Sequence, residues 1–430
     1  MARTTNFGDV NFNCLLLIFK FVNNLEDQIR LALCCRRFRD AFVYIHRQRF
    51  VEIVDSDIKL KNIDDWRAFL WMCGSNIKKL HSFYDDDHPL QLLPLVARFC
   101  NRLECLTLQN ATIAKSQPYL LQLTTLKKLN VSNYKCTSKD LIKCMKERLP
   151  YIRSIGLDSP FDRRELLELR HFIDLEELQI YDELTPSDFI VIIKPMRSLR
   201  SLQLRNAKRF LTTSTIKQLA INCHKLEKLS FFDSDADLTA LSLFEHLQYL
   251  QLCCPDNQKT LLFKALARKN GSPLEYLILQ RKSWINEEQA QYISAMKCLK
   301  WLVCKPRNDR CVEHLSKLMQ LECLSLQCAR DIGETSLMSL IRNNDQLRYL
   351  NICYCLGITD AFIVDMLDYL SKRRAQQPLE LYAAVTDIRR EIMQRLPADY
   401  ASKSLCLYFE CSQGICSNEH FYNDEPEFER

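Results

Sequence analysis

The phrase L-x-x-L-x-L recurs through most of this 430-residue chain, and that recurrence limits the fold more than any single residue does. Copies begin between 21 and 27 residues apart, as from Leu226 to Leu247 and from Leu199 to Leu226. A fixed period of this length indicates a repeat array, in which each unit packs on its neighbours and no central core is needed. Eleven well-formed copies begin at Leu103, Leu126, Ile152, Leu175, Leu199, Leu226, Leu247, Leu274, Leu299, Leu321 and Leu347, and a degenerate copy begins at Ile77.

Each copy has the alternation of a short strand followed by a segment with helical spacing. Leu106 and Leu108 are expected to point inward, while Cys105 and Thr107 point out of the opposite face of the sheet. Segments such as 138–146 and 213–220 have apolar residues at helical intervals. The sequence therefore predicts an α/β solenoid with a parallel concave sheet and a helical convex side.

One copy continues into a distinctive cysteine pattern. The strand phrase at Leu347 is followed by Cys355-Leu356-Gly357-Ile358-Thr359-Asp360, and Cys100 and Cys223 precede two other phrases. This arrangement resembles the cysteine-containing class of leucine-rich repeats, which implies a horseshoe-shaped solenoid. Other repeats have Ala207 or Ala329 at the second cysteine position, so we expect an irregular internal hydrogen-bond pattern.

The composition is that of an ordinary globular chain. Hydrophobic residues make up 47% and charged residues 26%, and no apolar run reaches the roughly 18 residues that a membrane span needs. The 21 cysteines without an export signal favour free thiols and a cytoplasmic or nuclear location. A net charge of +6 is too dilute to indicate nucleic-acid binding.

The first fifty residues lack the repeat and predict three short helices. Residues 10–22 form the first, with Leu15, Ile18, Phe19 and Val22 on one face. Residues 25–34 form the second, and a third begins at Arg36. The pattern resembles the F-box, and the matching positions are Val10, Leu15, Leu16, Ile18, Phe19, Leu31, Cys35 and Phe38.

Two positions depart from the F-box pattern. Asn11 replaces the preferred proline and Phe38 replaces the usual tryptophan, although Asn11 or Asn13 can cap the helix instead. The resemblance implies that the matching residues bind a Skp-family adaptor, which links the chain to a cullin ubiquitin ligase. Exposed apolar residues on so small a unit indicate a partner surface. The alternative is that this face only docks the helices on the first repeat.

These patterns divide the chain into four parts. Residues 1–49 are expected to form the F-box, and 50–76 a linker with a capping helix that ends at Gly74. Residues 77–411 contain about 12–13 leucine-rich repeats. Residues 412–430 form an acidic tail, which is either a solvated end or a segment folded across the groove.

Motifs for catalysis are missing from the sequence. Its seven glycines include no phosphate-binding loop, and neither H-E-x-x-H nor G-x-S-x-G occurs, so we expect no catalytic residues and no cofactor. One weak metal candidate lies near the carboxyl end, but its spacing lacks the tight C-x2-C pairs of structural zinc sites. Its four residues are Cys406, Cys411, Cys416 and His420.

The third position of each phrase should face the concave groove, and its character changes along the chain. The earlier copies have Lys79, Cys105, Lys128, Ser154, Glu177, Ser201 and Lys228 there. The later copies have Tyr249, Tyr276, Trp301, Cys323 and Tyr349. Equivalent positions of successive strands form a column across the sheet. Exposed aromatic rings often anchor partners, so we expect the aromatic residues of this column, together with Phe232 one column away, to bind a target protein. The alternative is that the rings stack on each other and only stabilise the sheet.

These observations lead to one functional hypothesis and one alternative. The chain is expected to be a non-catalytic substrate-recognition subunit of an SCF-type ubiquitin ligase, with the F-box binding the Skp adaptor and the repeats binding a target protein. The alternative is a repeat scaffold with a degenerate F-box and no ligase role.

Overall fold

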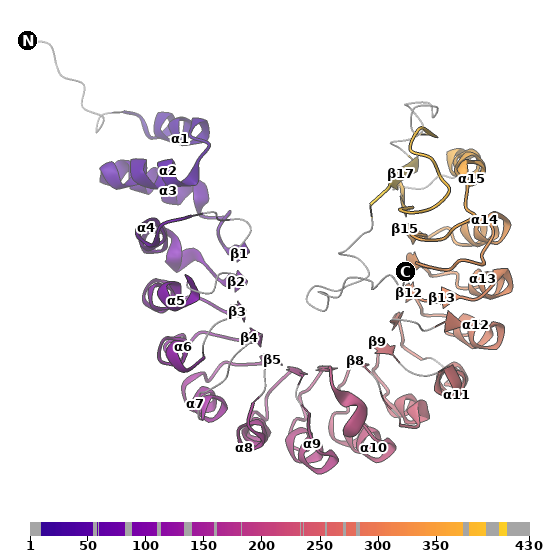
Figure 1. Ribbon diagram of the computed structural model, residues 1–430. Coiled ribbons are helices and arrows are strands. Elements are labelled where there is room, and N and C mark those ends of the chain that lie inside the picture. Colours follow the sequence, from indigo (N-terminus) through magenta and orange to yellow (C-terminus); the bar gives the residue numbers. More distant parts are fainter. Residues whose placement is uncertain are drawn as a thin grey trace, which may run out of the picture. The chain divides into compact units, whose positions relative to one another are not determined.

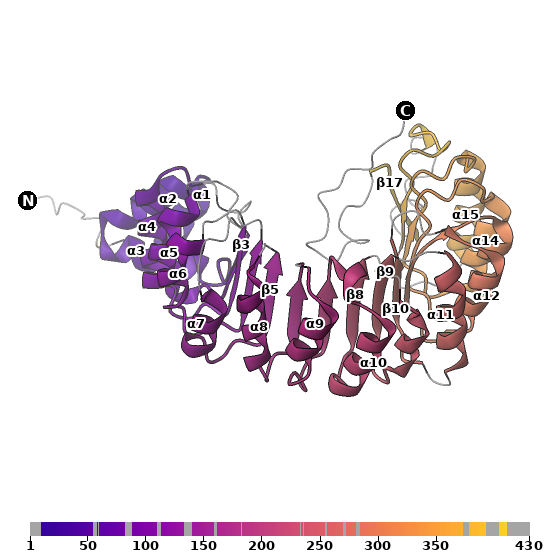
Figure 2. The ribbon, with the colours of Figure 1, turned by 60° about the horizontal axis from the view of Figure 1, so that its bottom comes forward.

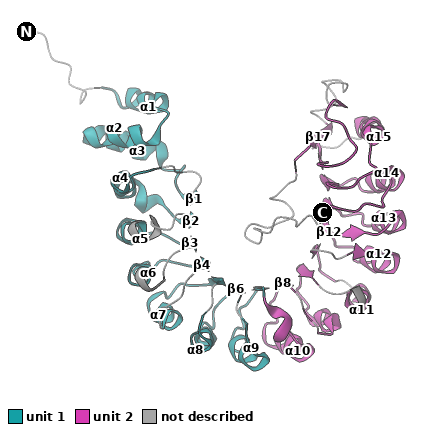
Figure 3. Cartoon of the chain, viewed as in Figure 1, with its two compact units in different colours: residues 1–205 teal, residues 206–430 magenta. Residues whose placement is uncertain are grey.

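In the computed structural model the described residues form two compact units, residues 1–205 and residues 206–430 (Figure 3). The structure describes residues 10–54, 58, 60–81, 88–109, 113–132, 140–158, 161–181, 183–232, 234, 236–253, 256–269, 272–280, 284–372, 378–392 and 404–410.

The first unit begins with three helices and continues as alternating strands and helices (Figure 1). Its opening helices are α1 (Phe12–Phe21), α2 (Leu25–Cys34) and α3 (Arg36–His46). The strands are β1 (Glu52–Val54), β2 (Lys79–His81), β3 (Cys105–Gln109), β4 (Lys128–Ser132), β5 (Ser154–Asp158), β6 (Glu177–Ile180) and β7 (Ser201–Leu204). The helices beside them are α4 (Ile63–Cys73), η3 (Gly74–Asn76), α5 (His88–Phe99), α6 (Ile113–Leu120), α7 (Leu141–Arg148), α8 (Arg163–Leu167), η4 (Glu168–His171) and α9 (Pro186–Ile193).

The second unit repeats the same alternation. Its strands are β8 (Lys228–Phe232), β9 (Tyr249–Cys253), β10 (Tyr276–Leu279), β12 (Trp301–Val303), β14 (Cys323–Ser325), β15 (Tyr349–Asn351), β16 (Leu379–Tyr382) and β17 (Leu405–Tyr408), with β11 (Trp284–Ile285) paired to β13 (Lys305–Pro306) in a separate ribbon. Its helices are η5 (Ala207–Arg209), α10 (Thr213–Asn222), η6 (Leu238–Leu243), α11 (Asp256–Arg268), α12 (Glu287–Ser294), α13 (Asp309–Leu315), α14 (Glu334–Asn343) and α15 (Asp360–Lys372).

Strands that follow one another along the chain pair in parallel within each unit, and the helices lie on one face of the sheet (Figure 2). The register aligns the repeat phrases position by position, so Leu106 pairs with Leu129 and Leu250 with Leu277. These inward leucines have no solvent exposure. This is the leucine-rich-repeat fold that the sequence predicts, because each repeat buries its leucines against the next.

Side chains at the helix starts connect neighbouring repeats of the second unit. Asp309, at the start of α13, accepts hydrogen bonds from the backbone N–H of Gly333 (2.6 Å) and the hydroxyl of Ser336 (2.7 Å). One repeat later, Glu334 accepts from the backbone and side chain of Thr359 at 2.7 and 2.8 Å. A carboxylate near a helix start thus caps the adjacent repeat, where it also meets the positive end of the helix dipole.

The structure contains two strands that the sequence pattern did not indicate. The segment 50–76 is more than a linker, because β1 pairs in parallel with β2 and begins the sheet before the first recognised phrase. The sequence also missed β16, where Pro378 and Ala383 replace the first and last apolar residues of the phrase. A helix lies where the capping helix is expected: α4 ends at Cys73, and Gly74 is its C-cap residue. None of the helices found in the described ranges is long and apolar enough to cross a membrane.

Three repeats of the second unit turn sharply after their strands through a left-handed backbone. Cys328, Tyr354 and Val385 have φ values of 67°, 61° and 55° at equivalent positions, five residues after the first open-face residue of each strand. Backbone bonds from Cys328 to Cys353 (2.9 Å) and from Tyr354 to Ala384 (2.8 Å) hold two of these turns. A β-branched residue such as Val385 is strained in this conformation.

Replacing Val385 with glycine is therefore expected to raise the free energy of unfolding by about 0.5–1 kcal/mol, because relief of the strain exceeds the added backbone entropy. Val364 is a matched control, since its side chain is 55% exposed, close to 57% for Val385, but lies in helix α15. Val364→Gly should lower stability. Chemical unfolding of the full chain measures both, and a Val385→Gly variant less stable than the parent would contradict the expectation.

Candidate functional site

The first three helices are short, and each of the first two begins with a side-chain cap. The side chain of Asn11 accepts a hydrogen bond from the backbone N–H of Asn13 (2.9 Å), and that of Asn24 accepts from Glu26 (2.9 Å). These caps satisfy donors that a helix start leaves free. The expectation that an asparagine can replace the missing proline is confirmed for Asn11.

The three helices enclose a small apolar core with one polar clamp at its centre. Phe19 stacks edge-on against Phe38 and lies 5.8 Å from Phe42. Gln28 is buried, and its amide nitrogen donates to the carbonyls of Phe19 (3.1 Å) and Val22 (2.5 Å) at the end of α1. The side-chain oxygen of Gln28 lies 2.6 Å from Nε2 of His46. One glutamine on α2 thus holds the end of α1 and the end of α3 together.

His46 is neutral in this environment. The amide oxygen of Gln28 can only accept, so Nε2 of His46 is the donor, and buried Nδ1 has no hydrogen-bond partner. Burial, with a smaller contribution from the cation of Arg49, lowers the pKa of His46 from 6.5 to about 4. Protonation would place a second N–H where no acceptor lies.

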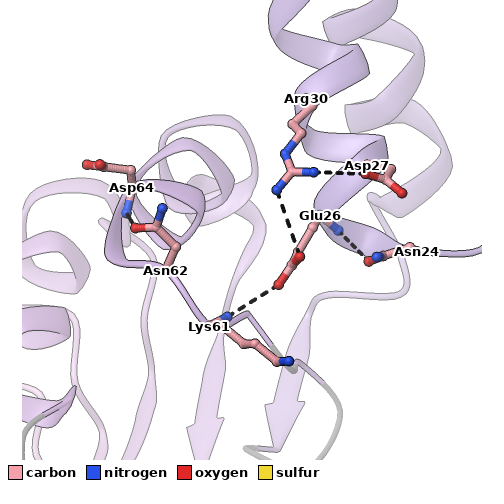
Figure 4. A network of polar contacts seen from close by, with 7 residues as sticks. All are labelled: Asn24, Glu26, Asp27, Arg30, Lys61, Asn62 and Asp64. Atoms are coloured by element: carbon pink, nitrogen blue, oxygen red, sulfur yellow. Dashed lines mark hydrogen bonds and ion pairs between the residues drawn. The ribbon is translucent and has the colours of Figure 1, made fainter.

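Aromatic contacts connect this helical domain to the first repeats. The ring of His46 lies 4.9 Å from Phe50, which packs edge-on against Phe69 of α4, also at 4.9 Å. On the surface, the carboxylate of Glu26 accepts a hydrogen bond from the backbone N–H of Lys61 (3.4 Å) and lies near Arg30 (Figure 4). The helical domain therefore packs directly on the capping helix.

The exposed apolar side chains of this domain are not the ones that its sequence pattern selects. Leu17, Phe21, Leu33 and Tyr44 are 52%, 82%, 52% and 60% exposed. Among the expected adaptor-binding residues, Leu15, Phe19 and Phe38 are buried in the domain's own core. These three residues support the surface of the domain from inside and are not themselves accessible to a partner. The remaining members are half-buried Val10, Leu16, Ile18 and Leu31, and exposed Cys35.

The F-box domain family matches residues 9–46, which include all three helices. The chain carries an F-box domain. The match ends at the last residue of α3, so it includes the Gln28–His46 clamp and the four exposed apolar residues. None of the curated proteins compared with the chain matches its sequence.

Among solved structures, a chain in the crystal structure of the Rad7 and Elc1 complex in yeast is similar to this chain. The TM-score is 0.45 and the identity 14%, over 93% of this chain and 98% of that chain. Similarity at this level carries no argument about function.

The open face of the first unit, which is the sheet face away from the helices, has paired charges. Lys79 bonds to Glu52 (2.8 Å), which lowers the pKa of that carboxyl, and Lys128 bonds to Glu177 (2.9 Å). The hydroxyl of Ser154 donates to the same Glu177 oxygen (2.8 Å). The register places the expected column Lys79, Cys105, Lys128, Ser154, Glu177 and Ser201 side by side.

One group on this face has the order of a hydrolytic triad. Nε2 of His81 lies 3.4 Å from the Glu52 carboxylate, and Nδ1 lies 3.2 Å from the hydroxyl of Thr107. Thr107 is only 4% exposed, so a substrate carbonyl could not reach its hydroxyl. The arrangement is therefore a polar contact between strands and gives no support for catalysis.

The open face of the second unit has a continuous ladder of aromatic rings. Tyr276 lies 6.0 Å from both Tyr249 and Trp301, and Trp301 stacks on Tyr349 at 6.5 Å across the intervening Cys323. The expected column is thus brought together in register, from Lys228 through Tyr349. Phe232 lies four residues beyond Lys228 on β8 and pairs with Cys253, so it is two positions of the open face away from the aromatic column and not one, and it is 8% exposed.

The ladder extends further than the sequence indicated. Tyr349 contacts Tyr382 (4.9 Å), which stacks on Tyr408 (4.6 Å), so the rings shift to the neighbouring column at β16. Tyr382 was missed because its phrase is degenerate. Tyr249 and Tyr349 are only 8% and 5% exposed, whereas Tyr276 and Trp301 are half-buried and Tyr408 is 39% exposed. The faces of these rings are therefore largely covered by the neighbouring rings.

The metal candidate receives no support from the described part of the chain. Cys406 lies on β17 beside Glu380, and no group of three metal-ligating side chains occurs among the described residues. Cys411, Cys416, His420 and the acidic tail 412–430 lie outside the described residues.

The depressed pKa of His46 predicts a pH dependence of F-box stability. Between pH 6.5 and 4 the unfolded state binds a proton that the folded state does not, so stability is full above pH 6.5 and falls as pH decreases. The loss by pH 4 is up to about 3 kcal/mol, from the 6.5-to-4 shift.

Hydrogen exchange of the α1–α3 amides, corrected for its intrinsic pH dependence, measures this loss. His46→Gln should flatten the profile, while the exposed His224→Gln should leave it unchanged. An identical pH profile in His46→Gln and the parent would contradict the assignment.

Proposed function

We propose that this chain is the substrate-recognition subunit of an SCF-type ubiquitin ligase. The F-box domain at residues 9–46 carries the proposal, because that domain is intact in its core and presents apolar side chains outward. Exposed leucine, phenylalanine and tyrosine side chains on a small domain indicate a protein partner, here a Skp-family adaptor that joins the chain to a cullin. A separate subunit would perform the ubiquitin-transfer chemistry.

The proposed adaptor contact uses Leu17 and Phe21 of α1 and Leu33 of α2. Leu17 and Phe21 are four residues apart, so they share one side of the helix. Lys20, the neighbour of Phe21, is exposed, which favours a partner with carboxylates near its apolar surface. The Gln28 clamp positions both helices and therefore acts on this contact indirectly.

The repeats would hold the target protein. Repeat arrays expose a long sheet face that suits extended protein partners. The accessible rings of the ladder on the second unit are Tyr276, Trp301, Tyr382 and Tyr408. These are the proposed anchors, and buried Tyr249, Tyr349 and Phe232 support them. Free thiols throughout the described residues are consistent with action in the cytoplasm or nucleus.

A second candidate is a repeat scaffold that recruits no ligase. One observation favours it: Leu15, Phe19 and Phe38, which match the F-box pattern, are all used in the internal core. The pattern could then be kept for folding alone. The two functions differ in one property, which is whether the folded chain binds the adaptor.

Changing Leu17 or Leu33 to aspartate is expected to weaken adaptor binding at least a hundredfold, because a charge would face an apolar partner surface. Leu243→Asp and Leu261→Asp are matched controls, with side chains 53% and 55% exposed on the second unit. Co-purification and calorimetry with adaptor measure the effect. Equal binding by Leu17→Asp, Leu33→Asp and the controls would refute the proposed contact, and no binding by the parent would favour the scaffold.

Changing Tyr276 and Trp301 together to alanine is expected to abolish target capture while adaptor affinity stays within twofold. This change removes two adjacent anchor rings from the middle of the ladder. Proteins that accumulate on the chain after proteasome inhibition, quantified by mass spectrometry, provide the readout. Tyr151→Ala, at an exposed turn of the first unit, is the control. If a folded double variant captures the same proteins as the parent, the proposed anchoring role is wrong and the rings only stabilise the sheet.

A further inference from the structure

One column on the open face of the first unit consists largely of side-chain amides. On strands β4 to β7 the register aligns Asn130 with Gly156, Gly156 with Gln179, and Gln179 with Gln203. The three amide-bearing residues are half-buried, so each keeps part of its surface open to a partner. We call these four residues the amide strip.

The glycine of the strip lets two of these amides approach each other. A Cβ atom on Gly156 would lie 2.5 Å from Oδ1 of Asn130 and 3.0 Å from Oε1 of Gln179, so both oxygens are directed at the space above the glycine. Oδ1 of Asn130 and Oε1 of Gln203 are shielded from solvent, and neither has a hydrogen-bond partner among the described residues. A shielded acceptor without a donor costs free energy, and a donor from a bound partner would recover it.

The charges beside the strip are paired, which limits the chemistry of a partner. Lys128 bonds to Glu177 on one side (2.9 Å), and Arg205 lies 3.8 Å from Asp158 on the other. A charged ligand would either break these pairs or find no opposite charge free to meet it. A primary amide both donates and accepts, as does a peptide group, whose N–H suits the unpartnered oxygens while its C=O suits the amide nitrogens. The complementary ligand is therefore uncharged main chain.

We propose that the amide strip binds the main chain of an extended, uncharged segment of the target protein. This site rests on the proposed function, and it gives the first unit a target-binding surface in addition to the aromatic ladder of the second. The terminal torsions of amide side chains are soft, so an oxygen directed at Gly156 can rotate to meet an N–H of the segment. Because main-chain groups are common to all sequences, the lack of charge selects the segment, and no particular side chain is required.

Binding of the full folded chain to an array of end-blocked twelve-residue peptides, half of them uncharged, tests the site. The uncharged peptides that bind the parent should bind Gln179→Met/Gln203→Met at least tenfold more weakly, because methionine keeps the length of glutamine but not its hydrogen bonds. Gly156→Ala should weaken binding similarly, since the added Cβ displaces the two amides above it. Gln122→Met is the matched control, because Gln122 is an exposed glutamine of the first unit that bonds to Pro118 after α6.

Methylation of the backbone nitrogens of a bound peptide tests main-chain recognition. Methylating a contacted nitrogen should weaken binding to the parent at least tenfold and change little in Gln179→Met/Gln203→Met. A folded parent that binds none of the peptides, that prefers the charged ones, or that binds no better than the double variant overturns the site. If the parent binds peptides through the strip but does not bind adaptor, the proposed function fails and the site stands.

Discussion

Burial of each repeat's inward leucines against the adjacent repeat is the constraint on which the rest of the structure depends. Leu106, Leu129, Leu250 and Leu277 have no solvent exposure, and each belongs to a short strand that could not bury it alone. Parallel pairing in register is the arrangement that aligns these side chains. The same register places the third residue of each phrase on the open face. The leucines that build the sheet therefore also determine which residues are available to a partner.

Much of the architecture followed from that periodicity, and the misses have physical causes. The strands at Cys105 and Tyr349 begin where their phrases predict, because alternation of apolar residues reports which face is buried. β16 escaped recognition because Pro378 and Ala383 interrupt its phrase, although pairing with β15 and β17 on both sides supports it. Pairing with strands on both sides can thus stabilise a strand whose own apolar pattern is weak. The local sequence does not show this tertiary contribution.

The binding surfaces were less predictable than the fold. A hydrophobic stripe identifies the face of a helix that leaves water, and in α1 this face, Leu15 and Phe19, packs into the F-box itself. The residues left over, Leu17 and Phe21, lie off the stripe, so periodicity gave no reason to select them. On the second unit the column of rings was predictable from register, but the exposure of Tyr276 compared with Tyr349 depends on ring stacking, which a sequence does not specify.

Stacking also restricts how the aromatic ladder can recognise a protein. Interior rings such as Tyr349 contact rings on two sides, at 6.5 and 4.9 Å, so their faces are occupied and their edges remain. Among the described residues, Tyr408 at the end of the ladder stacks on Tyr382 alone, and it is 39% exposed. Edges and hydroxyl groups favour directional polar contacts, whereas a free face favours apolar or cationic groups. The sheet-stabilising and partner-binding interpretations of these residues are therefore compatible, because stacking fixes the rings rigidly and a fixed ring loses little entropy when it binds.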